Sequence, residues 1–292
     1  MPRTVQSEIV YDSSFFTPVQ MQPRSVLSIG FTNWARWASQ HLVSFPQLVR
    51  RYGVSFVVVH LRIEYLAPFR FLDGDRVLVS TGVQVDTTGR YLHVTSEVTN
   101  GDYAIARAES YARCVRLDSD RGFGAETGRI PDVLSALFDA DEQGAPPPPR
   151  VLHESLEALE TGHPAVAAAA NPVVMHRGLC EVADQWSFVE IPAQLGAARE
   201  TLVARHGGRI PRIRSGLTSP VRCIEIELMR PFFLLDEATF AAAAHHVDDS
   251  VAFSHRLLGR DGRLHGLALE TFDAPVEPPA NALRAPHDDT TH

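Results

Sequence analysis

The sequence predicts an α+β protein made of two tandem copies of one unit, each an antiparallel sheet wrapped around a long central helix. Three observations favour this fold. The chain has 292 residues, enough for two ordinary domains. Apolar and polar residues alternate in short runs such as Arg76–Val83 and Tyr91–Val98, which is typical of half-buried strands. Several segments of the first part recur in the same order in the second, which indicates an internal duplication.

The clearest recurring segment is strand-like. His60–Asp73 matches Cys223–Asp236 without a gap, 163 residues further along the chain, with alternating residues and the pairs Pro-Phe and Leu-Asp in common. Weaker matches join Pro18–Met21 to Pro172–Met175, Asn33–Trp37 to Asp184–Phe188, and Ala108–Tyr111 to Leu269–Phe272. Because the four matches keep their order, we expect each copy to fold in the same way.

Each copy is expected to contain a short strand, a loop, a long helical stretch and four further strands. The helical stretches are predicted at about 30–52 and 180–206. The strands are predicted at 55–66, 76–85, 90–99 and 103–116, and again at 220–230, 238–248, 250–258 and 263–272. Asn100-Gly101 and Asp261-Gly262 predict tight hairpin turns, because these residues tolerate positive φ. Since one curled sheet cannot bury a long helix alone, a second copy must complete it.

The elements divide the chain into four parts. Residues 1–117 and 151–274 are the two predicted domains, 118–150 a linker and 275–292 a disordered tail. The linker is polar and acidic, with a short amphipathic helix expected from Pro131 to Glu142. It ends in Pro146–Pro149, which is typical of a stiff polyproline spacer.

The composition excludes several classes of function. The net charge of −8 argues against nucleic-acid binding, which needs a basic surface. No apolar run approaches the ~20 residues of a membrane span, and the start lacks the apolar stretch of a secretory signal, so a cytoplasmic protein is expected. All 27 basic residues are arginine, which excludes lysine Schiff-base chemistry, a lysine-bound pyridoxal cofactor and a P-loop. Cys114, Cys180 and Cys223 form no CxxC pair, so neither a disulfide framework nor a metal site is expected, and no cofactor is implied.

The first copy resembles the 4-hydroxybenzoyl-CoA thioesterase-like superfamily, which has the hotdog fold. Ile63–Val77 is similar to the family's strand–turn–strand signature, and Phe31–Trp37 resembles the start of its helix. The resemblance covers most of residues 5–117 and reaches 172–273 mainly through the internal repeat. It implies two tandem hotdog domains that form a pseudo-dimer and act on acyl groups carried as thioesters by coenzyme A or an acyl carrier protein. It leaves open whether the double unit forms a homodimer.

The loop before the helix departs from the family. The thioesterases usually carry an acidic residue and Gly-His-Val-Asn there, whereas Met21–Gly30 has neither acid nor histidine. In the second copy, Arg-Gly-Leu followed by Glu-x-x-x-Gln in His176–Gln185 is faintly similar to the hotdog dehydratases. Hydrolysis is the expected reaction, because the segments of the first copy resemble the thioesterases most. A dehydratase or hydratase, a polyketide-type acyltransferase or decarboxylase, and a non-catalytic acyl-binding protein remain alternatives.

The resemblance implies an acyl tunnel between the two units, with backbone N–H groups of a helix start facing the thioester carbonyl. A nearby carboxylate or histidine would activate water or transfer a proton. The catalytic candidates are Glu181, Asp184 and His176 in the second loop and Asn33 in the first helix. Glu181 and Gln185, four residues apart, would share one face of a helix. The alternatives are polar residues supporting a helix start, a solvated first-turn acid and an ordinary loop histidine.

The substrate-binding candidates are basic. Arg24 lies in the first loop, with a surface salt bridge as its alternative, and His60 lies on a strand among valines, where a core or tunnel-lining histidine is expected. Arg209, Arg212 and Arg214 belong to a basic insertion, residues 205–214, that the first copy lacks. They could bind coenzyme A phosphates or the acidic surface of a carrier protein, and the alternative is a solvated loop.

Overall fold

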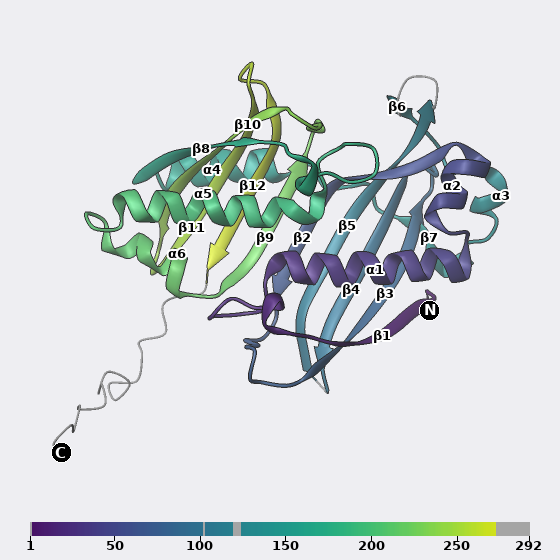
Figure 1. Cartoon of the computed structure of the whole chain (residues 1–292), viewed down its shortest axis with the longest axis horizontal. Helices are drawn as coiled ribbons and strands as arrows, with labels where there is room; N and C mark the ends of the chain where they lie inside the picture. The colour runs from purple at the N-terminus through teal and green to yellow at the C-terminus, as the bar shows by residue number, and fades with distance from the viewer. Residues whose placement is uncertain (1, 102, 119–123, 273–292) are drawn as a thin grey trace.

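The computed structural model describes residues 2–101, 103–118 and 124–272 (Figure 1). The chain is an α+β protein, as the sequence predicts, with one large and almost entirely antiparallel sheet and the long helices α1 and α5 on one of its faces. The helices are α1 (Pro23–His41), α2 (Phe45–Tyr52), α3 (Asp132–Ser135), α4 (Leu152–Gly162), α5 (Ile191–His206) and α6 (Ser215–Thr218). The strands are β1 (Thr4–Val10), β2 (Val54–Tyr65), β3 (Arg76–Asp86), β4 (Tyr91–Asn100), β5 (Tyr103–Asp118), β6 (Gly124–Thr127), β7 (Gln143–Ala145), β8 (Ala167–Val174), β9 (Val221–Leu228), β10 (Glu237–Val247), β11 (Ser250–Gly259) and β12 (Leu264–Phe272).

The order of the strands repeats. Within the described residues, the sheet runs β1-β3-β4-β5-β2-β9-β12-β11-β10-β8. Read from each edge toward the middle, β1, β3, β4, β5 and β2 correspond in order to β8, β10, β11, β12 and β9. We call residues 2–145 the first half and 151–272 the second half. The halves meet where β2 pairs with β9, which we call the seam, in the register Leu61–Ile226 and Ile63–Ile224. All four of these side chains are fully buried, so the core continues across the seam.

The strands form where the sequence alternates, because successive side chains of a strand point to opposite faces of the sheet. In β3 the side chains of Val77, Val79, Thr81 and Val83 are buried, while the residues that alternate with them are at least partly exposed. The strand boundaries predicted from the sequence differ from the observed ones by no more than two residues. The hairpin glycines Gly101 and Gly262 have φ of 57° and 75°, as the predicted turns require.

The two long helices begin at other residues than the sequence predicts. Helix α1 begins at Pro23, whose fixed φ suits the first helical position, and ends at His41. The predicted stretch to residue 52 is broken because a second proline, Pro46, starts the separate helix α2. Helix α5 begins only at Ile191, because residues 180–190 form a tight turn and a 3-10 turn instead. The N-terminal ends of both helices lie near the seam (Figure 1).

Three of the sequence matches do not join equivalent positions. The outer strand of the first half is β1, so Pro18–Met21 lies in a loop whereas Pro172–Val174 belongs to β8. Counted from the prolines at the helix starts, Asn33 corresponds to Leu202 in α5, and Asp184 lies in a turn before that helix. The third match, at Ala108–Tyr111, is out of register by one residue, with consequences described below.

Much of the predicted linker belongs to the first half. Strand β6 pairs with the C-terminal end of β5, and strand β7 pairs with the C-terminal end of β3. Ile130, Leu134 and Phe138 are buried in the first half's core, which explains why these residues do not form a free spacer. The predicted helix over Pro131–Glu142 is reduced to α3 and a 3-10 turn at Ala140–Glu142.

Helix α4 follows Pro146–Pro149 and covers the opposite face of the sheet from α5. Its Leu152 and Leu156 pack against Leu267 of β12. The predicted disordered tail, residues 275–292, lies outside the described residues. Among the described residues, no helix combines the length and the apolar character needed to cross a membrane.

Candidate functional site

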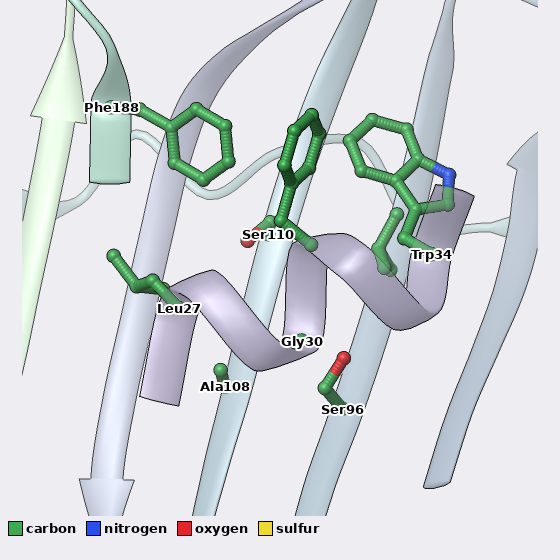
Figure 2. A pocket seen from close by; sticks show the side chains of 9 residues that line it. Leu27, Gly30, Trp34, Ser96, Ala108, Ser110 and Phe188 are labelled. Carbon is green, nitrogen blue, oxygen red and sulfur yellow. The ribbon is translucent and has the colours of Figure 1, made fainter. Parts of the chain in front are cut away.

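A narrow cavity lies between α1 and the helix-covered face of the first half's sheet (Figure 2). Its volume is about 20 Å³, which is room for about one water molecule. The walls are apolar except for two hydroxyl groups, and no wall residue titrates near neutral pH. They come from α1, β4, β5 and a turn of the second half: Leu27, Gly30, Phe31, Trp34, Val94, Ser96, Ala108, Ser110 and Phe188.

Small residues keep the space open between helix and sheet. A Cβ atom on Gly30 would lie 3.1 Å from Oγ of Ser96, closer than ordinary packing allows without movement. The Ser96 hydroxyl shares a hydrogen bond of 2.8 Å with the buried Thr81 hydroxyl. Glycine inside a helix costs roughly 0.5–1 kcal/mol relative to alanine, so Gly30 trades helix stability for close approach of α1 to β4.

The second half closes this cavity of the first half. Phe188 begins the 3-10 turn Phe188–Glu190, and its ring meets Phe31 edge-on, with the centroids 5.3 Å apart. In Figure 2 the Phe188 ring reaches in beside α1. Two residues later, Glu190 accepts two hydrogen bonds from Arg24 of α1, from Nε (2.9 Å) and from an NH2 group (2.8 Å). The site is therefore built from both halves, and Arg24 is a residue that joins them.

The loop that carries Phe188 is not the helix start that the sequence predicts. The backbone N–H of Glu181 donates to the carbonyl of Gln185 (2.8 Å), and that of Asp184 donates to the carbonyl of Glu181 (3.0 Å). Asp184 has φ of 53°, which suits a tight turn. The turn is tied to the β9–β10 connection through the backbone N–H of Trp186, which donates to the carbonyl of Phe232 (2.8 Å). Glu181 and Gln185 thus face each other across a turn and do not share a helix face.

The three candidates of this loop have different environments. The pKa of Glu181 is raised to about 7 by desolvation. Glu181 is nevertheless an exposed residue, so we attribute this rise to the protein atoms close to the carboxyl group and not to burial of the side chain. Asp184 forms an ion pair of 2.8 Å with Arg177, and His176 lies exposed on the surface. Burial raises the pKa of the Cys180 thiol, which leaves it a poor nucleophile.

Asn33 has a structural position. It is buried, its side-chain oxygen accepts from the Ser7 hydroxyl (2.6 Å), and its side-chain N–H donates to the carbonyl of Val5 (2.7 Å). These bonds fasten α1 to β1, away from the residues that line the cavity.

His60 lies on the other face of the sheet. Its neighbour Leu61 points toward the helices, so the His60 side chain points away from them. Its Nε2 lies 3.0 Å from Oε1 of Glu225 across the seam, and this hydrogen bond lowers the pKa of Glu225. His60 is thus a buried histidine that ties the halves together and does not line the cavity.

The arginine-rich insertion lies at the far end of α5. Helix α5 has 16 residues and is therefore about 24 Å long, and the insertion follows its C-terminus while Phe188 precedes its N-terminus. An NH2 group of Arg212 donates to the carbonyl of Asp248 (2.5 Å) and lies 3.3 Å from Oδ1 of Asp249. Nε of Arg214 donates to the carbonyl of Gly207 (2.8 Å), and Arg209 is exposed.

A buried charged cluster in the second half was not predicted. Arg199 of α5 forms an ion pair with Glu270 of β12, and Nε2 of His255 in β11 lies 3.0 Å from the other carboxylate oxygen. His255 and Glu270 are fully buried. Although burial raises the pKa of Glu270, the positive charge of Arg199 and the hydrogen bond from His255 hold it at about 2. Within the described residues, no three His, Cys, Asp or Glu side chains are arranged to hold a metal ion.

Three solved structures match nearly the whole chain. A protein assigned as an oleoyl thioesterase of Lactobacillus plantarum has a TM-score of 0.73 at 12% identity, over 95% of this chain and 97% of that one. The 12:0-ACP thioesterase of Umbellularia californica has a TM-score of 0.64 at 11% identity, over 93% and 98%. An acyl-ACP thioesterase of Bacteroides thetaiotaomicron has a TM-score of 0.62 at 11% identity, over 92% and 98%. No protein-family model and no curated protein matches the sequence. At these identities the likeness shows the fold, which is that of the hotdog thioesterases.

Proposed function

We propose that the chain is a double-hotdog thioester hydrolase whose two halves form a pseudo-dimer. The repeated strand order and the antiparallel seam between β2 and β9 support two copies of one domain. The domains would be residues 1–117 and 151–274, and residues 124–145 of the linker would be an extension of the first. The similar solved structures are thioesterases by name, two of them for acyl-ACP, which supports an acyl thioester of a carrier protein or coenzyme A as the substrate.

The observation that carries the proposal is the cavity under α1. Its apolar walls suit an acyl chain, and its closing residue Phe188 comes from the other half, so the thioester would lie where the halves meet. In the present conformation there is room for about one water molecule, so an acyl chain must displace side chains. Phe188, on a short turn held by the Arg24–Glu190 ion pair, is the side chain that we expect to move.

Glu181 is the proposed general base. A carboxylate with a pKa of about 7 is partly ionised at neutral pH and can both accept and return a proton. It would take a proton from water as the water oxygen bonds to the thioester carbon, and then give the proton to the leaving thiolate when the carbon–sulfur bond breaks. The products are a carboxylic acid and a thiol. The N-terminal ends of α1 and α5 near the seam would stabilise the negative carbonyl oxygen.

One observation favours a second function, non-catalytic binding of acyl groups. None of the nine residues that line the cavity can act as an acid or base at neutral pH. Glu181 belongs to the loop that closes the cavity but not to its wall, so binding without chemistry would need only the apolar walls. A dehydratase or an acyltransferase would use the same cavity for a different reaction.

Release of free thiol from a panel of acyl-CoA and acyl-carrier-protein substrates separates these functions. A hydrolase releases thiol with water alone, an acyltransferase needs an acceptor, and a dehydratase or binding protein releases none. We expect Glu181→Gln to lower kcat about 100-fold or more, while Cys180→Ala, the matched neighbour, keeps nearly full activity. Because the base must be ionised, kcat/KM should rise with pH up to about 7 in the wild type and lose that rise in Glu181→Gln.

Two results would contradict the assignment. If no substrate releases thiol but acyl-CoA still binds, the chain is a binding protein. If Cys180→Ala and Glu181→Gln lose the same activity, the shape of the loop matters and the carboxylate is not the base.

A further inference from the structure

We infer that Arg199, His255 and Glu270 occupy, in the second half, the space that corresponds to the cavity of the first half, so that the described part of the chain has one acyl-binding cavity and not two. The acyl-binding part of this inference rests on the proposed function. It goes further by naming the residues that decide which half binds.

The strand register makes Glu270 the counterpart of Ser110. Leu61 of β2 and Ile224 of β9 are equivalent in the sequence repeat, 163 residues apart, and both point toward the helices. Leu61 pairs with Ser110 in β5, and Ile224 pairs with Glu270 in β12. The hydroxymethyl group of Ser110, which faces the cavity, thus corresponds to the carboxylate of Glu270, which faces α5.

The next pair of strands makes His255 the counterpart of Ser96. The next inward-facing residues of β5 and β12 are Ala108 and Ala268, which are equivalent by the same pairing. Ser96 of β4 pairs with Ala108, and His255 of β11 pairs with Ala268. A second small cavity-lining side chain is therefore replaced by a large one.

The helices complete the correspondence. Gly30 lies seven residues after Pro23, the first residue of α1, and Arg199 lies seven residues after Pro192, the second residue of α5. Gly30 has no side chain and lies directly against Ser96, whereas Arg199 extends from the corresponding position to the carboxylate of Glu270.

The three replacements form a single bonded unit. Gly30, Ser96 and Ser110 together present a hydrogen atom and two hydroxyls to the cavity. At the same places, the guanidinium and the imidazole each bond to one oxygen of the carboxylate, and His255 and Glu270 are fully buried. The Arg199 guanidinium also lies 5.2 Å from the Phe272 ring centroid, so the cluster is packed on that side as well.

The test uses the full chain and S-dodecyl-coenzyme A, a thioether that cannot be hydrolysed, in titration calorimetry. The wild type should bind one molecule per chain, and two equivalent molecules per chain would overturn the inference. Gly30→Leu should fill the first-half cavity and abolish binding, while Ser28→Leu, on the exposed side of α1, should bind as the wild type does. Binding that persists in Gly30→Leu would also overturn it.

The reverse change gives the second half the residues of the first. The triple variant Arg199→Gly, His255→Ser, Glu270→Ser should bind two molecules per chain, and its crystal structure should show a cavity between α5 and strands β11 and β12. A space closed by collapse would overturn the inference. If the triple variant has an open cavity but neither the wild type nor any variant binds S-dodecyl-coenzyme A, the result would support the inference that the Arg199–His255–Glu270 cluster fills this space. It would at the same time reject the proposed function. If the triple variant does not fold, the stoichiometry of the wild type and the loss of binding in Gly30→Leu still decide between one site and two.

Discussion

The two halves of the sheet share their strand order but differ in what lies under the long helix. Beneath α1 the residues Gly30, Ser96 and Ser110 leave a cavity, and beneath α5 a charged cluster takes the same place. The loops differ in the opposite sense, because the titratable candidate Glu181 lies in the second half's loop, seven residues before Phe188 of the cavity wall. A duplicated fold can therefore give one copy the space for a ligand and the other copy the reactive groups.

The physical reason is that one ligand site needs contributions from two sides. The concave side of one unit provides the apolar wall, and the neighbouring unit provides the closing loop. Under the proposed function one such pair is sufficient, so the space of a second cavity can be filled. Filling it with charge is costly unless every charge is paired, and Arg199 with His255 surrounds Glu270 in this way.

The largest effect is expected from breaking the cluster. Glu270→Ala leaves the Arg199 guanidinium buried without its partner, which should lower the free energy of unfolding by about 3–5 kcal/mol in urea denaturation. The matched control is Glu109→Ala, because Glu109 was paired with Glu270 in the sequence but lies on the other face of the sheet. It should cost less than about 1 kcal/mol. Equal costs would mean that the cluster does not stabilise the second half.

The unfolding free energies of the wild type and of Glu270→Ala should depend differently on pH in the acid range. Folding lowers the pKa of Glu270 from 4.5 to about 2, so its ionised form stabilises the fold at every pH above 4.5. This contribution is lost as the pH falls from 4.5 toward 2. The difference in unfolding free energy between wild type and Glu270→Ala should therefore shrink over that range.

A smaller effect is expected at Asn33, which corresponds to Leu202 of the second half. Asn33→Leu removes the partners of the Ser7 hydroxyl and the Val5 carbonyl, so it should lower the unfolding free energy by about 1–3 kcal/mol. Since Asn33 faces β1 and not the cavity, thiol release per folded molecule should not change. If Asn33→Leu had normal stability but released no thiol, Asn33 would be a catalytic residue after all.

The smallest effect is expected from the arginine-rich insertion. Changing Arg209, Arg212 and Arg214 together to Ser should alter KM less than about three-fold, because the insertion is a helix length away from Phe188 and exposed charge contacts contribute little. The measurement is KM for acyl-CoA and for acyl carrier protein at low and high salt. A ten-fold rise that disappears at high salt would show that the insertion binds the carrier.

The order of the elements could be predicted because it depends on local pattern. Alternation along Arg76–Val83, the hairpin glycines and the duplicated strand segment were sufficient for the sheet and for the hotdog resemblance, since each reports the faces of its own segment. The helix limits were less well predicted, because Pro46 and the turn at Glu181 compete with helix formation over short stretches. The loop candidates Glu181, Asp184 and His176 could be identified by residue type, but the sequence did not predict the contacts and the exposure of their side chains.

The sequence by itself determined that the chain is a duplicated α+β protein without lysine chemistry, and which loop carries its acidic candidates. Only the tertiary structure decided which half is hollow. A shift of one residue moves a strand side chain to the other face of the sheet, so an alignment that pairs Glu270 with Glu109 instead of Ser110 conceals the cluster completely. The contacts of Arg199, His255 and Glu270 join three elements that are far apart in the chain, and no local pattern reports how such elements meet.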